Sequence, residues 1–185
     1  SIEDREVIRK EYNLPLQKKI FVYGGNLGVP QGVDFLLKII NETTTNDVFY
    51  LIVGLGTQLK KMSNWFENNG PSNAKLVPGL SKENYDKLLA ACDVGLIFLY
   101  KNFTIPNFPS RLLSYLEMGM PVIAATDINT DIGIVIEKAE SGYWVESGNI
   151  KSFQKKILNI CSNKELFKKM QENSRYLLNS KYTVD

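Results

Sequence analysis

The chain has 185 residues, of which 44% are hydrophobic and 23% are charged, and its net charge at pH 7 is +2. This composition is typical of a globular protein with one substantial core, so we expect a single domain over residues 1–185. The small net charge argues against a dedicated nucleic-acid binder, and no apolar run approaches the roughly 18 residues that span a bilayer. The sequence lacks histidine, which excludes imidazole catalysis and histidine-ligated metals.

The N-terminus is charged, lacks the apolar core of a signal peptide and does not begin with Met, so we expect the chain to be part of a longer protein. Cys92 and Cys161 fall on the apolar stripes of expected helices and form no metal or disulfide pattern. They predict buried, inert thiols in a reducing compartment, and therefore a cytoplasmic protein.

Six short apolar or β-branched segments, each bounded by Gly, Pro, Asn or Asp, predict strands buried on both faces. They lie at residues 20–23, 48–53, 75–77, 94–100, 122–125 and 143–145. Helices are expected between them, where apolar residues recur at positions i, i+3, i+4 and i+7, at residues 33–40, 85–92 and 132–139. Ser81 is a natural N-cap with Glu83 in the first turn, and Thr57 is expected to cap the helix that follows it.

The alternation of strands and helices predicts an α/β fold, a doubly wound, Rossmann-like parallel sheet of about six strands. Such sheets bind ligands at the carboxyl ends of their strands, at the point where the strand order reverses. We therefore expect function in the loops that follow Tyr23, Val53, Val77 and Tyr100.

Two further helices are expected at residues 150–161 and 163–179. From Lys151 to Lys181 the chain holds seven Lys and one Arg against two Glu. This charge predicts either a solvated surface or a peripheral contact with an anionic membrane surface, and both interpretations stay open.

The loop after the first strand reads Tyr23-Gly24-Gly25-Asn26-Leu27-Gly28, close to the Gly-x-Gly-x-x-Gly of dinucleotide-binding enzymes. A dehydrogenase would also need an acidic residue at the end of the second strand to hold the ribose, whereas this strand ends Val53-Gly54-Leu55-Gly56. Two interpretations remain: the glycines close a tight turn, or they let a diphosphate or sugar approach the bare backbone.

The loop after the third strand contains Pro78, Gly79 and Leu80, and its outward peptide groups suit hydrogen bonds to a flat base. Taken alone, this loop is equally a plain connection between a strand and a helix. The loop at residues 101–111 is long and apolar, and long loops at this edge are usually functional. Arg111 lies in the first turn of the next helix, where a cation is unfavourable. A bound phosphate would remove this conflict, and an ion pair with a surface carboxylate is the alternative.

Four motifs occur in order: Gly-Gly-x-Leu-Gly…Gln-Gly, Val-Gly-x-Gly-Thr, Gly-Leu-Ser-Lys-Glu-x-Tyr, and Pro-Ser-Arg-Leu-x-Ser-Tyr-Leu-Glu-x-Gly-x-Pro-Val-Ile-Ala. Together they resemble the C-terminal domain of family 4 glycosyltransferases of GT-B fold, from about Arg5 to the last helix. The chain looks closest to the bacterial enzymes that build capsular and O-antigen polysaccharide, in the fucosamine transferase-like branch.

The resemblance implies that the chain is one half of a GT-B fold and binds a nucleotide-sugar donor. The donor-binding residues that it implies are Gly24, Gly25, Asn26, Gln31, Gly54, Gly56, Pro78, Gly79, Leu80, Asn107, Phe108, Pro109, Ser110, Arg111 and Ser114.

The chain departs from the family pattern at the positions of the usual charged residues. Many members have an Arg and a Lys where this chain has Asn26 and Gln31. Two glutamates that contact the donor sugar and ribose would fall on Pro106 and Ser114. The catalytic residues are therefore unknown, and Arg111 is the cation expected at the diphosphate. A ligand role for Glu117, one turn beyond Ser114, is a minor alternative.

The implied activity is transfer of a sugar, with retention of configuration, from a nucleotide diphosphate to a glycan or lipid-linked acceptor. The chain has no Asp-x-Asp motif, so we expect no metal and no other cofactor. The N-terminal acceptor domain is expected to be absent, which predicts that this chain alone is inactive. The alternatives are a GT-B nucleotide-sugar 2-epimerase and a non-catalytic binding or partner module.

Overall fold

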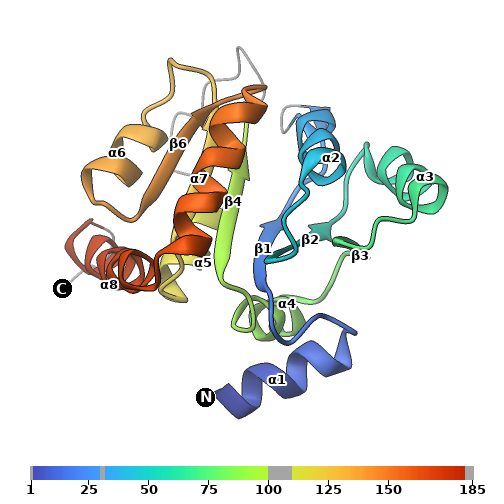
Figure 1. Ribbon diagram of the computed structural model, residues 1–185, viewed down its shortest axis with the longest axis horizontal. Coiled ribbons are helices and arrows are strands. Elements are labelled where there is room, and N and C mark those ends of the chain that lie inside the picture. Colours follow the sequence, from blue (N-terminus) through green and yellow to red (C-terminus); the bar gives the residue numbers. More distant parts are fainter. Residues whose placement is uncertain (1, 30–31, 100–109, 182–185) are drawn as a thin grey trace.

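The computed structural model describes residues 2–29, 32–99 and 110–181, and six parallel strands form its one sheet (Figure 1). The strand order is β3-β2-β1-β4-β5-β6, the order typical of dinucleotide-binding folds. The strands are β1 (Lys19–Gly24), β2 (Val48–Gly54), β3 (Ala74–Pro78), β4 (Val94–Phe98), β5 (Val122–Thr126) and β6 (Gly142–Glu146). All pairings are parallel, which confirms the predicted doubly wound α/β fold.

The central strands are continuous apolar runs because both faces of the sheet are covered. Phe21 and Tyr23 of β1 point into one hydrophobic cluster, whereas Ile20 and Val22 point into the other. All residues of β4 and β5 are buried. Alternating side chains of the strands therefore pack into two hydrophobic cores, one on each face of the sheet.

Helices α2 (Val33–Glu42), α3 (Leu59–Asn69) and α7 (Ile150–Ser162) pack on the first face, and α4 (Lys82–Leu89), α5 (Ser110–Glu117) and α6 (Ile132–Lys138) on the second. The last helix, α8 (Lys164–Lys181), contributes Phe167 and Met170 to the first cluster and Leu177 to the second. Helix α8 therefore reaches both layers.

The predicted N-caps have different outcomes. Ser81 caps α4, since its Oγ accepts a hydrogen bond from the backbone N–H of Asn84 at 3.2 Å. The prediction for Thr57 is wrong, because α3 begins after Gln58 and has no side-chain cap. The N–H of Gln58 instead donates to the carbonyl oxygen of Leu27 at 2.8 Å, so this turn joins the first loop before the helix starts.

The two thiols lie among apolar neighbours. Cys92 is buried and donates to the carbonyl oxygen of Leu88, and burial raises the pKa of its thiol. The prediction that Cys161 is buried is wrong, because its position near the end of α7 leaves it half-buried; this partial burial raises its pKa to about 11. Both thiols are therefore protonated at neutral pH, as expected of structural cysteines.

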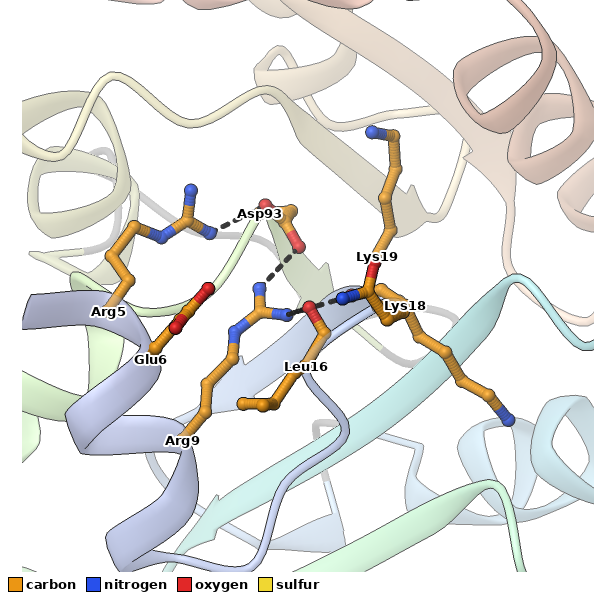
Figure 2. Close-up of a pocket in the computed structure, with 8 residues that line it drawn as sticks. Arg5, Glu6, Arg9, Leu16, Lys18, Lys19 and Asp93 are labelled. Carbon is orange, nitrogen blue, oxygen red and sulfur yellow. Dashed lines mark hydrogen bonds and ion pairs between the residues drawn. The ribbon is translucent and has the colours of Figure 1, made fainter. Parts of the chain in front are cut away.

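The N-terminal helix α1 (Ile2–Glu11) is anchored by an ionic network that the sequence analysis missed (Figure 2). The carboxylate of Asp93 accepts hydrogen bonds from Arg5 at 2.7 Å, from Arg9 at 2.9 Å and from the backbone N–H of Ile20 at 2.8 Å. Arg9 is only 6% exposed and also donates to the carbonyl oxygens of Ala91 and Lys18. The network joins α1 to the amino ends of β1 and β4.

We expect Asp93→Asn to lower the free energy of unfolding by about 3 kcal/mol, because it leaves the buried Arg9 guanidinium without its counter-charge. Denaturant unfolding measures this loss. The control is Asp86→Asn, which breaks an exposed pair with Lys82 and should cost less than about 1 kcal/mol. Equal losses in the two variants would contradict a structural role for the network.

Candidate functional site

A cleft of about 540 Å³ lies at the carboxyl ends of β1, β2 and β3, beside the N-terminus of α5. This edge includes the point between β1 and β4 where the strand order reverses. The cleft is lined by Gly24, Gly25, Asn26, Val53, Gly54, Leu55, Gly79, Leu80, Tyr85, Ser110, Arg111 and Ser114. Among these described residues there is one cation and no carboxylate, so the lining suits an anion.

Backbone hydrogen bonds hold the three glycine-containing loops together. The N–H of Gly25 donates to the carbonyl oxygen of Val53 at 2.9 Å, and that of Gly79 donates to Gly54 at 3.1 Å. A Cβ at Gly54 would collide with the carbonyl oxygen of Gly25, so this close approach requires glycine. The bare backbone thus forms one wall of the cleft.

Arg111 extends from the first turn of α5 toward the first loop. Its Nη1 donates to the hydroxyl of Tyr23 at 3.0 Å, and its Cζ lies 5.2 Å from the centre of the Tyr23 ring. A Cβ added to Gly25 would lie 2.9 Å from its Nη2. No ion pair joins Arg111 to a carboxylate within residues 2–29, 32–99 and 110–181. The contacts that its guanidinium makes there include a hydrogen bond to the Tyr23 hydroxyl and the face of the Tyr23 ring, neither of which carries a counter-charge.

Two more tyrosines contact Gly24 at the cleft: Tyr85 belongs to the lining, and Tyr115 is buried behind it. The Tyr115 hydroxyl accepts from the N–H of Gly24 at 3.1 Å and donates to the carbonyl oxygen of Leu96 at 2.9 Å, so it bridges β1 and β4. The Tyr85 hydroxyl packs directly on Gly24, where a Cβ would collide with it. Burial raises the pKa of Tyr85 to about 12 and that of Tyr115 well above its ordinary value. Both hydroxyls therefore keep their protons at neutral pH.

The sequence analysis did not assign site roles to Tyr23, Tyr85 and Tyr115. Tyr23 and Tyr115 occupy buried positions of β1 and α5, and Tyr85 a half-buried position of α4, all of which aliphatic residues commonly fill. A buried tyrosine needs a hydrogen-bond partner for its hydroxyl, and this is the signal that could have marked them.

The structure brings nine of the predicted donor-binding residues into the cleft: Gly24, Gly25, Asn26, Gly54, Gly79, Leu80, Ser110, Arg111 and Ser114. Gly56 and Pro78 do not line it. Gly56 packs beneath Asn26, and Pro78 ends β3 beside Gly54. Glu117 is exposed at the end of α5, away from the lining. Gln31, Pro106, Asn107, Phe108 and Pro109 lie outside the described residues.

A family model described as "Glycosyl transferases group 1" matches residues 4–176. The chain belongs to this family. It is 25% identical over 134 residues to the putative colanic acid biosynthesis glycosyl transferase WcaI of Escherichia coli K12, an alignment that covers 72% of this chain and 33% of WcaI. The chain thus spans about a third of that relative.

Two solved structures share the fold. HepE from Anabaena, crystallised with UDP, superposes with a TM-score of 0.82 at 15% identity, covering 98% of this chain and 49% of HepE. The C-terminal domain of the group 1 protein LpcC from Francisella tularensis superposes with a TM-score of 0.76 at 18% identity, covering 98% of this chain and 94% of that one. These likenesses match the Rossmann-like half of the GT-B fold.

The part of the chain that the structure describes contains no helix long and apolar enough to cross a membrane. Within the same residues, no group of three or more Cys, Asp and Glu side chains is placed to hold a metal ion.

We expect Tyr115→Phe to lower the free energy of unfolding by about 1–3 kcal/mol, because it leaves the buried N–H of Gly24 and the carbonyl oxygen of Leu96 without this partner. Thermal or denaturant unfolding measures the change. Tyr176→Phe is the control, since Tyr176 is 73% exposed and should be neutral. A neutral Tyr115→Phe would mean that the hydroxyl does not tie the two strands.

Proposed function

We propose that the chain is the donor-binding domain of a retaining, metal-independent glycosyltransferase that transfers a sugar from a nucleotide diphosphate to a glycan or lipid-linked acceptor. The observation that carries this proposal is the cleft, in whose described lining a single cation, Arg111, faces the glycine loops at the N-terminus of α5. Membership of the group 1 family supports sugar transfer.

The geometry suits a diphosphate beside Arg111. Free N–H groups at the start of a helix and a guanidinium both favour bound negative charge. The glycine backbones at Gly24 and Gly25 allow phosphate oxygens to approach the main chain closely. We assign the base to the edge formed by Gly79 and Leu80. The HepE structures, which contain UDP, UDP-glucose, or UDP with glucose, support a donor of this class.

The chemical role of the cleft would be to stabilise the leaving diphosphate. As the bond from the sugar to the diphosphate breaks, negative charge grows on the leaving oxygens. Fixed N–H dipoles and Arg111 would meet that charge without reorganising. The lack of both histidine and Asp-x-Asp in the sequence supports a mechanism without a metal.

The polysaccharide context follows from relatives and sequence motifs. WcaI is named for colanic acid biosynthesis, which supports a role in bacterial surface polysaccharide synthesis. We assign the chain to family 4 and its fucosamine transferase-like branch, acting in capsule or O-antigen synthesis in the cytoplasm. A peripheral membrane contact through α7 and α8 would use the exposed Lys151, Lys155, Lys168 and Lys169, although the exposed Glu165 and Glu172 favour a solvated surface.

One observation favours a second candidate. The described lining holds no carboxylate, and Pro106 and Ser114 stand where the family glutamates are expected. A nucleotide-sugar-binding module without catalysis would have such a site. A 2-epimerase would need several acid and base groups, and the described lining does not supply them.

Replacing Arg111 tests the site itself. Arg111→Ala should weaken binding of a nucleoside diphosphate by about 1.5–3 kcal/mol, the range for hydrogen bonds to a charged group, with little change in melting temperature. Calorimetric titration with UDP, GDP and dTDP measures the loss. Arg175→Ala, an exposed arginine on α8, is the matched control and should bind as tightly as the original chain. Unchanged affinity in Arg111→Ala would show that the cation is not at the diphosphate.

Removing divalent cations tests the role of the dipoles. Donor affinity should be the same with and without EDTA, because fixed N–H groups and Arg111 would supply the positive charge. Titrations in EDTA, and then with added Mg²⁺ or Mn²⁺, measure this. An affinity that EDTA abolishes and a metal restores would contradict the proposal.

The activity of the isolated chain tests the two-domain arrangement. Residues 1–185 alone should show no sugar transfer or donor hydrolysis above background, because positioning of the acceptor can supply roughly 7–11 kcal/mol of the barrier. A longer protein that joins this chain to an acceptor-binding domain should transfer sugar from labelled UDP-, GDP- or dTDP-sugars. Transfer by the isolated chain would mean that the acceptor binds within these same loops, and a longer protein that binds donor without transfer would favour the non-catalytic module.

A further inference from the structure

Tyr23 lies just beneath the cleft and does not form part of its lining. Its side chain is 1% exposed, and its ring packs against Phe98 of the neighbouring strand β4, with ring centres 5.9 Å apart. The ring is therefore fixed by the core of the protein. Its hydroxyl is the group that reaches the site.

The Tyr23 hydroxyl makes two hydrogen bonds of opposite sense. It donates its proton to the carbonyl oxygen of Asn26 at 2.6 Å, which fixes the first loop, and it accepts from Nη1 of Arg111 at 3.0 Å. The guanidinium also lies over the Tyr23 ring. Burial raises the pKa of Tyr23 although the charge of Arg111 opposes the rise, so the hydroxyl is protonated at neutral pH and its proton stays on the bond to Asn26.

An arginine side chain has many rotamers, and freezing it when a ligand binds weakens binding. Arg111 is instead held before any ligand arrives, between the Tyr23 hydroxyl and Gly25. The lining contains no second described cation that could take its place. The orientation of this one side chain therefore decides how well an anion binds.

We propose that Tyr23 is a positioning residue for the donor diphosphate, acting through Arg111 without touching the donor. The inference rests on the proposed function, in which Arg111 binds the diphosphate. Tyr23 would hold the guanidinium against the first loop, and the N–H groups that it does not use would point to the ligand. Because the same hydroxyl bonds to Asn26 and to Arg111, it would also fix the position of the first loop relative to the guanidinium.

The test is a double-mutant cycle with four proteins: the original chain, Tyr23→Phe, Arg111→Ala and the double variant. Each is titrated with UDP, GDP, dTDP and inorganic pyrophosphate, the last of which probes the anion site without a base. Tyr23→Phe keeps the ring and should weaken binding about three- to tenfold, the range for one lost hydrogen bond. In the Arg111→Ala background Tyr23→Phe should weaken binding by a smaller factor than in the original chain, because the part of its effect that passes through Arg111 is already lost.

Tyr50→Phe is the matched control. Tyr50 is also fully buried, lies on the adjacent strand β2, and has a hydroxyl hydrogen-bonded to Oγ1 of Thr43 at 2.8 Å. Its loss should change stability and leave affinity for the same four ligands unchanged. Melting temperatures of all variants are measured in parallel.

The outcomes separate the two claims. If none of the four ligands binds, or if Arg111→Ala binds as tightly as the original chain, the proposed function fails and this inference with it. If Arg111→Ala binds weakly but Tyr23→Phe binds normally, only the positioning role is wrong. That role is also wrong if Tyr23→Phe weakens binding equally in the Arg111→Ala background, or if Tyr23→Phe fails to fold while Tyr50→Phe folds.

Discussion

The hydroxyl of Tyr115 joins the two strands between which the strand order of the sheet reverses, and the geometry of the cleft depends on it. It accepts from Gly24 at the end of β1 and donates to Leu96 in β4. Tyr115 and Arg111 are four residues apart on α5, so they lie on the same face of that helix. Because the hydroxyl of Tyr115 is hydrogen-bonded to the sheet, Arg111, one turn closer to the N-terminus of α5, lies beside the glycine loop.

The electrostatics follow from this placement. A guanidinium in the first turn of a helix adds to the positive end of the helix dipole, which is unfavourable without a bound anion. The ring and hydroxyl of Tyr23 contact the guanidinium and partly offset this unfavourable interaction. No carboxylate of the described lining neutralises the charge. The positive charge of Arg111 in the cleft is therefore one that a bound diphosphate would neutralise.

The fold and much of the cleft could be predicted from the sequence because their signals are local. Strands buried on both faces show as short apolar runs, and the glycines at positions 24, 25, 54 and 79 mark tight turns after strands. The anchoring of helix α1 was missed because the carboxylate that binds its arginines, Asp93, lies far from them along the chain. The site roles of Tyr23 and Tyr115 were missed for a similar reason, since their hydroxyls bond to Arg111 of α5 and to Gly24 and Leu96 of the sheet.

The most direct test of the account is to locate the bound nucleotide by NMR. Amide signals of the ¹⁵N-labelled chain would be followed during titration with UDP, GDP and dTDP. The account predicts that at least one nucleotide shifts the signals of Gly24, Gly25, Gly79 and Arg111, while those of Arg9 and Asp93 at the opposite edge of the sheet stay in place. Shifts confined to the Asp93 edge, or no shifts with any of the three nucleotides, would contradict it.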